Sequence, residues 1–445
     1  MVERKKKILL AMLAAITVLV TACGSGSDKN GGPGAAEGKN DKPEAVNLTF
    51  FTSQTKYKDV YKKIADRIKE KENITVDFQL VPDDQYQTMI KTKLATGDVP
   101  DIFEHNAPTE YATVNAEKNM LDLSDEPWVQ RLVNPDILKD SNGKIWAMPR
   151  ESSSGFMGVY YNKQVFEDLG MADVEAPKTY ADFLAILDKI KNSGKDIAPI
   201  YMPDKDSWVL QIFVSGGLPL YLEEEDPQAW EKLKTNQAKW TDYQSYETVL
   251  NLALDLYKNG YVNKDHASAT YDMAQDALAT GKAAMMVTGE WTVNDMQTKY
   301  PDLELGSFAI PFNDLDKIAI GAFVQSFYIP KEAKHADAAK KFLELLSQPE
   351  YFDEYFQENP GFPAFKDING GDVPESVKRF VDNYVANNNY TIEMNGQIPE
   401  MQPILSDLWK SYIDMVNGGA TPKQVVENWQ KKYEEFMKAK GYPGF

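Results

Sequence analysis

The chain has 445 residues with 48 basic and 67 acidic side chains, so its formal net charge at pH 7 is −19. This length predicts two or more lobes rather than one compact core. The acidic balance argues against a nucleic-acid partner and against a surface that lies flat on anionic lipid.

The chain lacks the residue patterns of common metal and phosphate sites. Its three histidines and one cysteine form no cluster with zinc-ligand spacing, and no glycine-rich loop ends in Lys-Ser or Lys-Thr. Asp367, Asn369 and Asp372 lie in a Gly-rich turn, but Lys378 stands where a calcium loop needs glutamate, which favours a surface turn. We expect no metal and no cofactor.

The N-terminal residues 1–22 have the layout of a secretory signal peptide. A basic start, Arg4 to Lys7, precedes an apolar run from Ile8 to Val20. This run is too short for a membrane-spanning helix, which needs roughly 20 residues. Leu19 to Cys23 resembles a bacterial lipobox, which predicts a lipoprotein signal peptide and acylation of Cys23. The alternative is a plain signal peptide in which Cys23 is incidental.

Residues 23–45 are predicted to be a flexible linker that starts at the acylated Cys23. They are rich in Gly, Ser, Asp, Lys, Asn and Pro and show no apolar periodicity. The protein is therefore expected on the outer face of the bacterial cytoplasmic membrane, held by its lipid anchor.

The first part of the folded chain alternates predicted strands and helices. In chain order these are a strand from Val46, a helix with Val60, Ile64 and Ile68 inward, a strand over 74–80, a helix over 83–96 and a strand over 101–103. This order predicts a mostly parallel α/β sheet. Ligands bind beyond the carboxyl ends of such strands, so the loops 52–57 and 104–108 are of interest.

Later elements follow the same rules. Thr179 and Thr421 open helices with capping boxes, and a helix carrying Trp208 is predicted to end at Gly216-Gly217. A buried strand over 283–287 is followed by Gly289-Glu290-Trp291. From His335 onward the pattern is mainly helical.

Eight short stretches occur in a recognisable order and spacing. They are Phe50 to Thr55, Ala95 to Ile102, Leu121 to Leu123, Gly143 to Pro149, Val159 to Lys163, Gly281 to Met286, Gly289 to Trp291 and Ala338 to Leu343. With the lipobox, they resemble the family 1 extracellular solute-binding proteins, carbohydrate-binding lipoproteins of bacterial ABC importers related to the maltodextrin-binding protein. The resemblance runs over most of residues 46–438.

The resemblance implies a type II periplasmic-binding-protein-like α/β fold with two lobes, each a mostly parallel sheet flanked by helices, joined by a multi-crossing hinge. Lobe 1 would comprise residues 46–158 and 322–358, and lobe 2 residues 159–321 and 359–445. The crossings are expected near Val159 to Tyr161, Ile310 to Phe323 and Asn359 to Phe362. The protein would be a monomer that closes over a sugar.

A sugar site needs aromatic platforms and polar side chains. By resemblance, Trp291 and Trp409 would stack on sugar and Trp208 is a third candidate; core packing is the alternative for each. The polar candidates are Gln54, Glu104, His105, Asn106, Arg150, Ser153, Ser154, Glu290 and Gln325, and Phe323 and Gly361-Phe362 are expected near the crossings. For the polar residues, ordinary loop and turn positions are the alternative.

The resemblance predicts a receptor that delivers a carbohydrate to the permease subunits of an ABC transporter and performs no catalysis. A membrane-tethered glycoside hydrolase is the alternative from another class, since acidic residues are abundant and two of them across one cleft would suffice. A receptor for a non-sugar solute on the same scaffold is the third possibility.

Overall fold

The computed structural model describes residues 44–445, apart from 153, 154 and 173. The predicted signal peptide, Cys23, most of the linker, and Ser153 and Ser154 therefore lie outside the described residues. No helix in the described part combines the length and apolar composition needed to cross a membrane.

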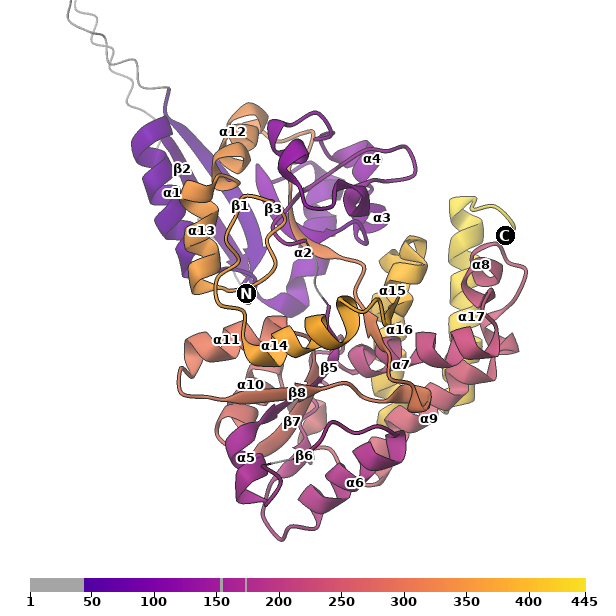
Figure 1. Cartoon of the computed structure of the whole chain (residues 1–445). Coiled ribbons are helices and arrows are strands. Elements are labelled where there is room, and N and C mark those ends of the chain that lie inside the picture. Colours follow the sequence, from indigo (N-terminus) through magenta and orange to yellow (C-terminus); the bar gives the residue numbers. More distant parts are fainter. Residues whose placement is uncertain (1–43, 153–154, 173) are drawn as a thin grey trace, which may run out of the picture. The chain divides into compact units, whose positions relative to one another are not determined.

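The first sheet has five strands in the order β2-β1-β3-β10-β4 (Figure 1). Their bounds are β1 Val46–Ser53, β2 Ile74–Val81, β3 Ile102–Ala107, β4 Met148–Pro149 and β10 Val324–Tyr328. β1 pairs in parallel with β2 and β3, as the alternation of strands and helices predicts. β10 comes from a distant part of the chain and runs antiparallel to β3 and β4, so the sheet is mixed.

The helices of this half of the molecule come from two separate stretches of the chain. They are α1 Asp59–Glu72, α2 Asp83–Thr96, α3 Tyr111–Val114, α4 Ala116–Asn119, η1 Pro127–Arg131, η2 Pro135–Leu138, α12 Ala336–Leu346 and α13 Pro349–Glu358. α1 buries Val60, Ile64 and Ile68 completely, as its periodicity predicts. α2 ends at Gly97, which takes the left-handed conformation with φ 77°.

The second sheet has four strands in the order β6-β7-β5-β8. Their bounds are β5 Gly158–Asn162, β6 Ala198–Ile200, β7 Ala283–Thr288 and β8 Leu305–Phe308. Only β6 and β7 are parallel, and β5 runs antiparallel to both of its neighbours, so the expectation of a mostly parallel sheet is wrong here. A separate pair joins β9 Ile318–Ile320 to β11 Tyr390–Ile392 in parallel.

The remaining helices of the described chain lie between residues 163 and 440. They are α5 Lys163–Asp168, α6 Tyr180–Lys191, α7 Leu210–Glu225, α8 Ala229–Lys234, η3 Trp240–Asp242, α9 Gln244–Lys258, η4 His266–Ser268, α10 Tyr271–Ala279, α11 Trp291–Lys299, η5 Phe312–Asp314, α14 Glu375–Phe380, η6 Val381–Val385, α15 Met394–Gln397, η7 Pro399–Ile404, α16 Leu405–Val416 and α17 Pro422–Lys440. In Figure 1, α5, α6 and α10 lie beside the second sheet, whereas α8 and α17 lie to its right. The capping boxes of Thr179 and Thr421 form as predicted at the starts of α6 and α17.

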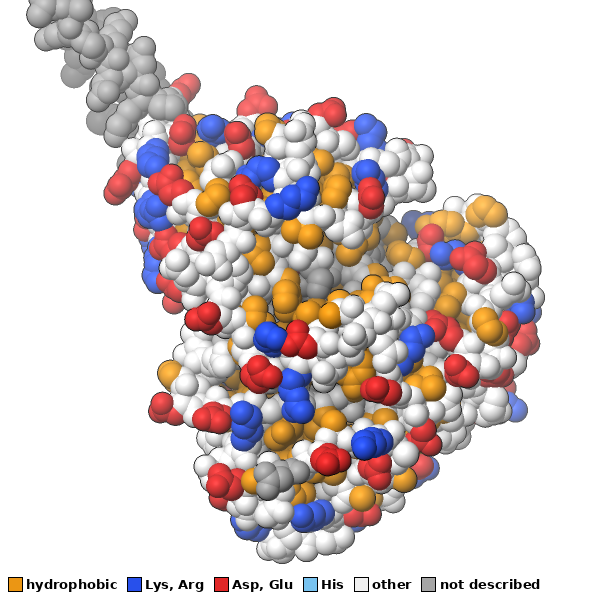
Figure 2. Space-filling view, in the orientation of Figure 1, with side chains coloured by type: hydrophobic (Ala, Val, Ile, Leu, Met, Phe, Trp, Pro, Cys, Tyr) orange, Lys and Arg blue, Asp and Glu red, His pale blue; other side chains and the backbone are white. Residues whose placement is uncertain are grey.

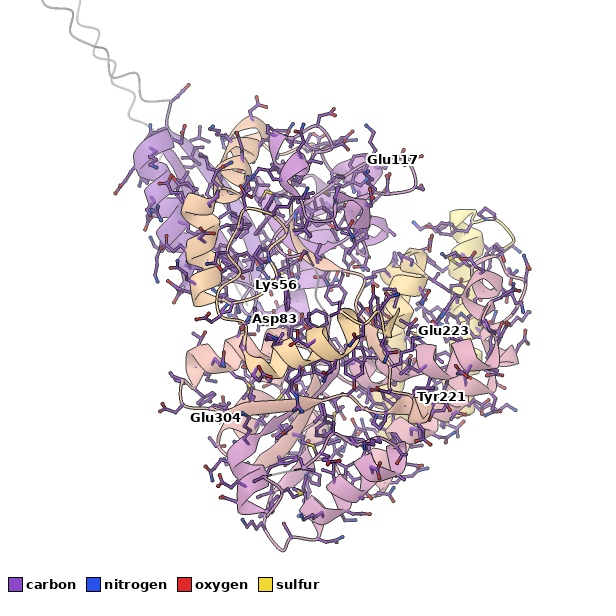
Figure 3. All side chains as sticks on the ribbon, in the orientation of Figure 1. Lys56, Asp83, Glu117, Tyr221, Glu223 and Glu304 are labelled. Carbon is purple, nitrogen blue, oxygen red and sulfur yellow. The ribbon has the colours of Figure 1, made fainter. Side chains whose placement is uncertain are left out.

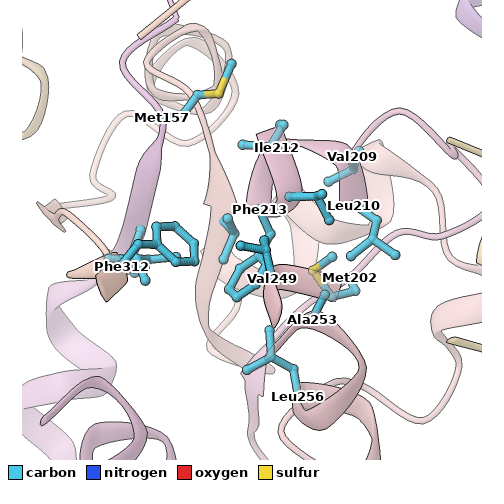
Figure 4. Close-up of a cluster of buried hydrophobic side chains, with 14 of the residues drawn as sticks. Met157, Met202, Val209, Leu210, Ile212, Phe213, Val249, Ala253, Leu256 and Phe312 are labelled. Carbon is cyan, nitrogen blue, oxygen red and sulfur yellow. The ribbon is translucent and has the colours of Figure 1, made fainter. Parts of the chain in front are cut away.

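The predicted helix end at Gly216-Gly217 is wrong, because α7 continues through both glycines and Pro219 to Glu225. A Cβ on Gly217 would come within 2.9 Å of the Phe312 ring, so the missing side chain serves close packing rather than a turn. Figure 4 shows Phe312 opposite α7 residues in this cluster. Trp208 lies just before the helix.

The buried hydrophobic residues form two separate clusters. The first core draws on residues 48–148 and 324–365, and the second core draws on residues 156–320 and 377–437. Each core therefore combines stretches that are distant in the sequence.

Three segments connect the two cores and lie side by side. Ser152 N donates to Phe362 O at 2.8 Å, and Gly321 N donates to Gly155 O at 3.1 Å. A Cβ on Gly155 would lie 2.6 Å from Gly321 N, so only glycine allows these backbones to approach so closely. β5, which we expected at the first crossing, is an inner strand of the second sheet, and the connecting segment precedes it.

Candidate functional site

Glu104, His105 and Asn106 lie inside β3. We had predicted them in a loop after this strand, and that prediction is wrong. β10 pairs with the strand as far as Ala107, which extends β3 beyond its apolar start. Polar residues can occupy this strand because β3 lies between β1 and β10, where their side chains find partners or meet other polar groups.

Glu104 is a fully buried carboxylate with partners on both oxygens. Oε1 accepts a hydrogen bond from Arg150 Nη1 at 2.7 Å, and Oε2 accepts one from Thr52 Oγ1 at 3.0 Å. Arg150 also donates to Tyr61 OH at 2.7 Å and pairs with Glu151. A buried ion pair completed in this way holds the strands in register and has little capacity left for a ligand.

His105 and Glu110 lie next to each other, each with one unpartnered atom. His105 Nδ1 accepts from the backbone N–H of Asn106 at 2.9 Å, so the proton of the neutral imidazole lies on Nε2. Nε2 lies 3.8 Å from Glu110 Oε2, and neither atom has another partner among the described residues. Burial, followed by the charges of Lys56 and Lys91, holds the pKa of His105 well below its usual range.

Glu110 is surrounded by side chains from several elements. Its Oε1 accepts from Gln402 Nε2 at 2.9 Å and from Gln87 Nε2 at 3.3 Å. Burial raises the pKa of Glu110 and lowers the pKa of Lys56, whose ammonium lies 5.4 Å from the centre of the Tyr86 ring. Figure 3 shows Lys56 beside Asp83. Because Gln402 is in η7, this contact joins a residue near the first core to one near the second.

Further buried polar atoms without hydrogen-bond partners lie near the ends of β1 and β3, at the start of β10 and in η7. Asn106 Oδ1, Gln325 Oε1, Gln402 Oε1 and Ser53 Oγ have none among the described residues. Asn106 and Gln325 lie opposite each other on β3 and β10. Since buried polar atoms are nearly always hydrogen-bonded, this concentration of free donors and acceptors points to a ligand site.

We call His105, Asn106, Glu110, Gln325 and Gln402 the polar cluster. Figure 2 shows a recess between the region of α3 and α4 and the region of α15 and α16, with hydrophobic side chains on its walls. Glu110 and Gln402 belong to these two regions, and α3 contacts η7.

Trp208 and Trp291 form a half-buried aromatic pair. Their ring centres are 6.4 Å apart, and the Trp208 ring lies 5.1 Å from that of Tyr271. The Trp291 ring covers Gly289, where a Cβ would come within 2.0 Å of it. Trp208, Trp291 and Trp409 are the three partly exposed tryptophans of the chain, and the other five are buried. Partial exposure leaves each of the three able to stack on a ligand.

Both carboxylate oxygens of Glu290 already accept hydrogen bonds from the backbone, so this side chain is not free to contact a ligand. Its carboxylate accepts the backbone N–H of Gly155 at 2.9 Å and that of Phe156 at 2.7 Å. Burial raises its pKa to about 7. Glu290 therefore ties the start of α11 to the first connecting segment.

The remaining predicted residues are scattered. Gln54 is exposed just after β1, and Phe323 is half-buried against Gly321. Trp409 is on α16, with its buried Nε1 unpartnered within the described part of the chain. Phe362 packs edge-on against Phe156 at 5.5 Å. The structure thus brings together His105, Asn106 and Gln325 on one side and Trp208 and Trp291 on the other.

Lys56, Glu110 and Gln402 were not predicted from the sequence. Gln402 is 292 residues away from Glu110 along the chain, so no local pattern could pair them. Glu110 follows a cis Ala107-Pro108 bond at the end of β3. Its place two residues after a proline that ends the strand is the one local signal available. No group of three or more metal-ligating side chains occurs in the described part of the chain.

Residues 52–351 match the family model of the bacterial extracellular solute-binding proteins. The chain belongs to this family. The match covers more than half of the chain and both sheets, and the extracellular character of the family places the site outside the cytoplasm.

This solute-binding protein has relatives that are themselves named for their sugars. The multiple sugar-binding protein of Streptococcus mutans is 26% identical over 378 residues, which cover 82% of this chain and 83% of the relative. The melibiose/raffinose/stachyose-binding protein MelE of Bacillus subtilis is 24% identical over 329 residues, covering 71% and 74% of the two chains.

Solved structures share the fold. A chitin oligosaccharide binding protein superposes with a TM-score of 0.72 at 22% identity, covering 88% of this chain and 99% of the other. A sugar transporter from Bacillus licheniformis in complex with stachyose gives 0.68 at 22% identity, covering 88% and 100%. These likenesses confirm the predicted type II solute-binding fold.

Proposed function

We propose that this protein is the substrate-binding lipoprotein of an ABC importer and captures a neutral oligosaccharide between two lobes. Lobe 1 would comprise residues 46–158 and 322–358 and lobe 2 residues 159–321 and 359–445, which follow the two cores except at residues 156–158 and 359–365. Relatives that are named for multiple sugars and for melibiose, raffinose and stachyose support the class of ligand.

The observation that carries the proposal is the pair formed by His105 Nε2 and Glu110 Oε2. The first is a donor and the second an acceptor, and they are 3.8 Å apart without other partners in the described chain. A sugar hydroxyl both donates and accepts, so one hydroxyl can satisfy both atoms. A hydrogen bond to a charged group contributes about 1.5–3 kcal/mol.

The half-buried tryptophans provide the second kind of contact that a sugar needs. Trp291 and Trp208 would stack on the flat C–H faces of the sugar rings, and Trp409 is a third stacking candidate. Asn106, Gln325 and Gln402 would bond further hydroxyls. We assign Glu290 to the positioning of α11 and Glu104 to the strand register, since their carboxylates already have partners.

Binding of sugar to both lobes would favour their closed arrangement, because a ligand shifts an equilibrium only by its differential contacts. The permease subunits would then recognise the closed form. Residues 1–22 would direct export, and acylated Cys23 with the linker to residue 45 would tether the monomeric protein to the membrane. Replacing Cys23 with serine should abolish incorporation of labelled palmitate and release the protein into the medium.

The test is a titration of tryptophan fluorescence with a panel of neutral oligosaccharides. We expect a saturable change in emission, weakened at least tenfold in Trp291→Ala, because a stacked ring contributes about 1.5 kcal/mol or more. Trp128→Phe is the matched control, since Trp128 is buried in the first core. Absence of any response across the panel would contradict the proposal.

Chromatography of the same mixtures separates a receptor from a hydrolase. A receptor returns the oligosaccharide intact, whereas a glycosidase releases shorter products. Release of products that stops in Glu110→Gln would overturn the proposal in favour of the enzyme.

A further inference from the structure

Helix α11 links the aromatic pair to the other half of the molecule. The helix begins at Trp291, and Asn294 and Asp295 follow three and four residues later, so all three lie on one face. Asn294 Nδ2 donates to Pro360 O at 2.6 Å, in the third connecting segment. Asp295 forms an ion pair with Lys58.

The Lys58–Asp295 pair joins an element of the first core to one of the second. Lys58 is the residue before α1, whose inner face lies in the first core, whereas α11 contributes Val293 and Met296 to the second core. The side chains of Lys58 and Asp295 are 22% and 20% exposed. Lys58 Nζ also donates to Thr55 O at 3.1 Å, which fixes the loop after β1.

Each residue of this ion pair is close in sequence to a residue of the candidate site or to one beside it. Lys58 lies two residues after Lys56, whose pKa is influenced by the carboxylates of Glu104 and Glu110. Asp295 lies one helical turn after Trp291. The pair therefore joins the loop after β1 to the start of α11.

We propose that Lys58 and Asp295 form a latch that holds the two halves together at helix α11, four residues after Trp291, without touching the ligand. The latch stabilises the closed arrangement and slows the release of sugar, so it contributes to affinity independently of sugar identity. This inference rests on the sugar-binding function proposed above.

An ordinary ion pair inside one half provides the matched control. Lys63 and Glu358 form such a pair between α1 and α13, 2.6 Å apart, and both helices belong to the first core. Loss of the control pair leaves the relation between the two halves unchanged. A partly buried pair that joins two moving parts should affect dissociation, because affinity changes act mainly on the rate of release.

The experiment measures release of bound oligosaccharide by stopped-flow fluorescence in Lys58→Ala, Asp295→Ala, Lys63→Ala and the exchange Lys58→Asp/Asp295→Lys. We expect release about two- to fivefold faster in each of the two latch variants, restored at least in part by the exchange, and unchanged in Lys63→Ala. High salt should reduce the difference between wild type and Lys58→Ala. The melting temperatures should stay close to that of wild type.

X-ray scattering of the ligand-free proteins tests the latch without any sugar. Lys58→Ala should have a larger radius of gyration than wild type and Lys63→Ala should not. If wild type binds no sugar but the scattering changes as expected, the proposed function fails and the latch stands. Release rates and scattering that are unchanged in the latch variants would overturn the latch, as would faster release that the exchange leaves uncorrected.

Discussion

Two groups of aromatic rings near the second core differ in what surrounds them. In the packed group, Trp240 is 1% exposed, and its ring centre lies 5.5 Å from that of Tyr246 and 5.8 Å from that of Tyr433. In the half-buried group, Trp208 and Trp291 contact each other and Tyr271, and each keeps part of its ring accessible.

The difference shows which features separate the two groups of rings. Trp240 Nε1 and Trp429 Nε1 have no partner among the described residues although both rings are sealed in the core. Trp409 Nε1 on α16 also lacks one. An unpartnered indole N–H therefore occurs in buried and in partly exposed tryptophans alike. The two classes of tryptophan differ in the accessibility of the ring.

The largest expected effect removes a ring from the packed group. Trp240→Ala should lower the free energy of unfolding by about 3–5 kcal/mol, because it leaves a large cavity among rings that cannot close over it. Urea denaturation measures the loss. The fraction that stays folded should bind oligosaccharide with wild-type affinity, and a loss of affinity in that fraction would show that the packed group takes part in binding.

The same comparison can be made for two buried carboxylates, Glu104, which is paired with Arg150, and Glu110, which has one unpartnered oxygen among the described residues. Glu104→Gln breaks the ion pair with Arg150 and should cost about 3 kcal/mol of unfolding free energy, since the buried Arg150 then keeps only one of its two carboxylate partners, Glu151. Glu110→Gln should leave stability within about 1 kcal/mol and weaken sugar binding at least tenfold. Urea denaturation and calorimetric titration of the two variants separate the effects, and equal stability losses would refute the distinction.

The smallest expected effect is the pH dependence of stability that Glu290 causes. Glu290 positions the start of α11 and therefore supports Trp291 of the half-buried group. Glu290 holds a pKa of about 7 in the folded chain, above the ordinary value of 4.5. The folded state therefore retains a proton that the unfolded state releases, so this group's contribution to stability falls as pH rises from about 4.5 to about 7. The fall is at most about 1.4 kcal/mol per pH unit.

Comparison with Glu290→Gln isolates that contribution. Urea denaturation at pH 5, 6, 7 and 8 should show wild type losing stability relative to the variant up to about pH 7, with a constant difference above it. The packed group supplies the control, since Trp240→Phe should run parallel to wild type. Parallel curves for wild type and Glu290→Gln over the whole range would contradict the assignment.

The elements with strong local patterns could be predicted from the sequence. α1 follows from the spacing of Val60, Ile64 and Ile68, and α6 and α17 follow from capping boxes at Thr179 and Thr421. Gly216-Gly217 misled the prediction because a glycine that permits close packing against Phe312 looks the same as one that ends a helix.

The candidate site could be assembled from the sequence only in fragments, for a related reason. His105, Asn106 and Trp291 occupy or follow strand ends, so local reasoning could nominate them as candidates. Gln402 could not, because its contact with Glu110 depends on how the chain returns after crossing between the cores. Glu104 looked like a ligand contact, and only the position of Arg150 shows that its carboxylate is already paired.

Calorimetric titration of the intact protein with raffinose-type and chitin-type oligosaccharides tests the central claim most directly. The account predicts saturable binding of one oligosaccharide per chain, a negative heat-capacity change from burial of apolar surface, and strong weakening in both Trp291→Ala and Glu110→Gln. Undiminished binding in both variants would contradict it, because the ligand would then bind at neither the half-buried rings nor the polar cluster.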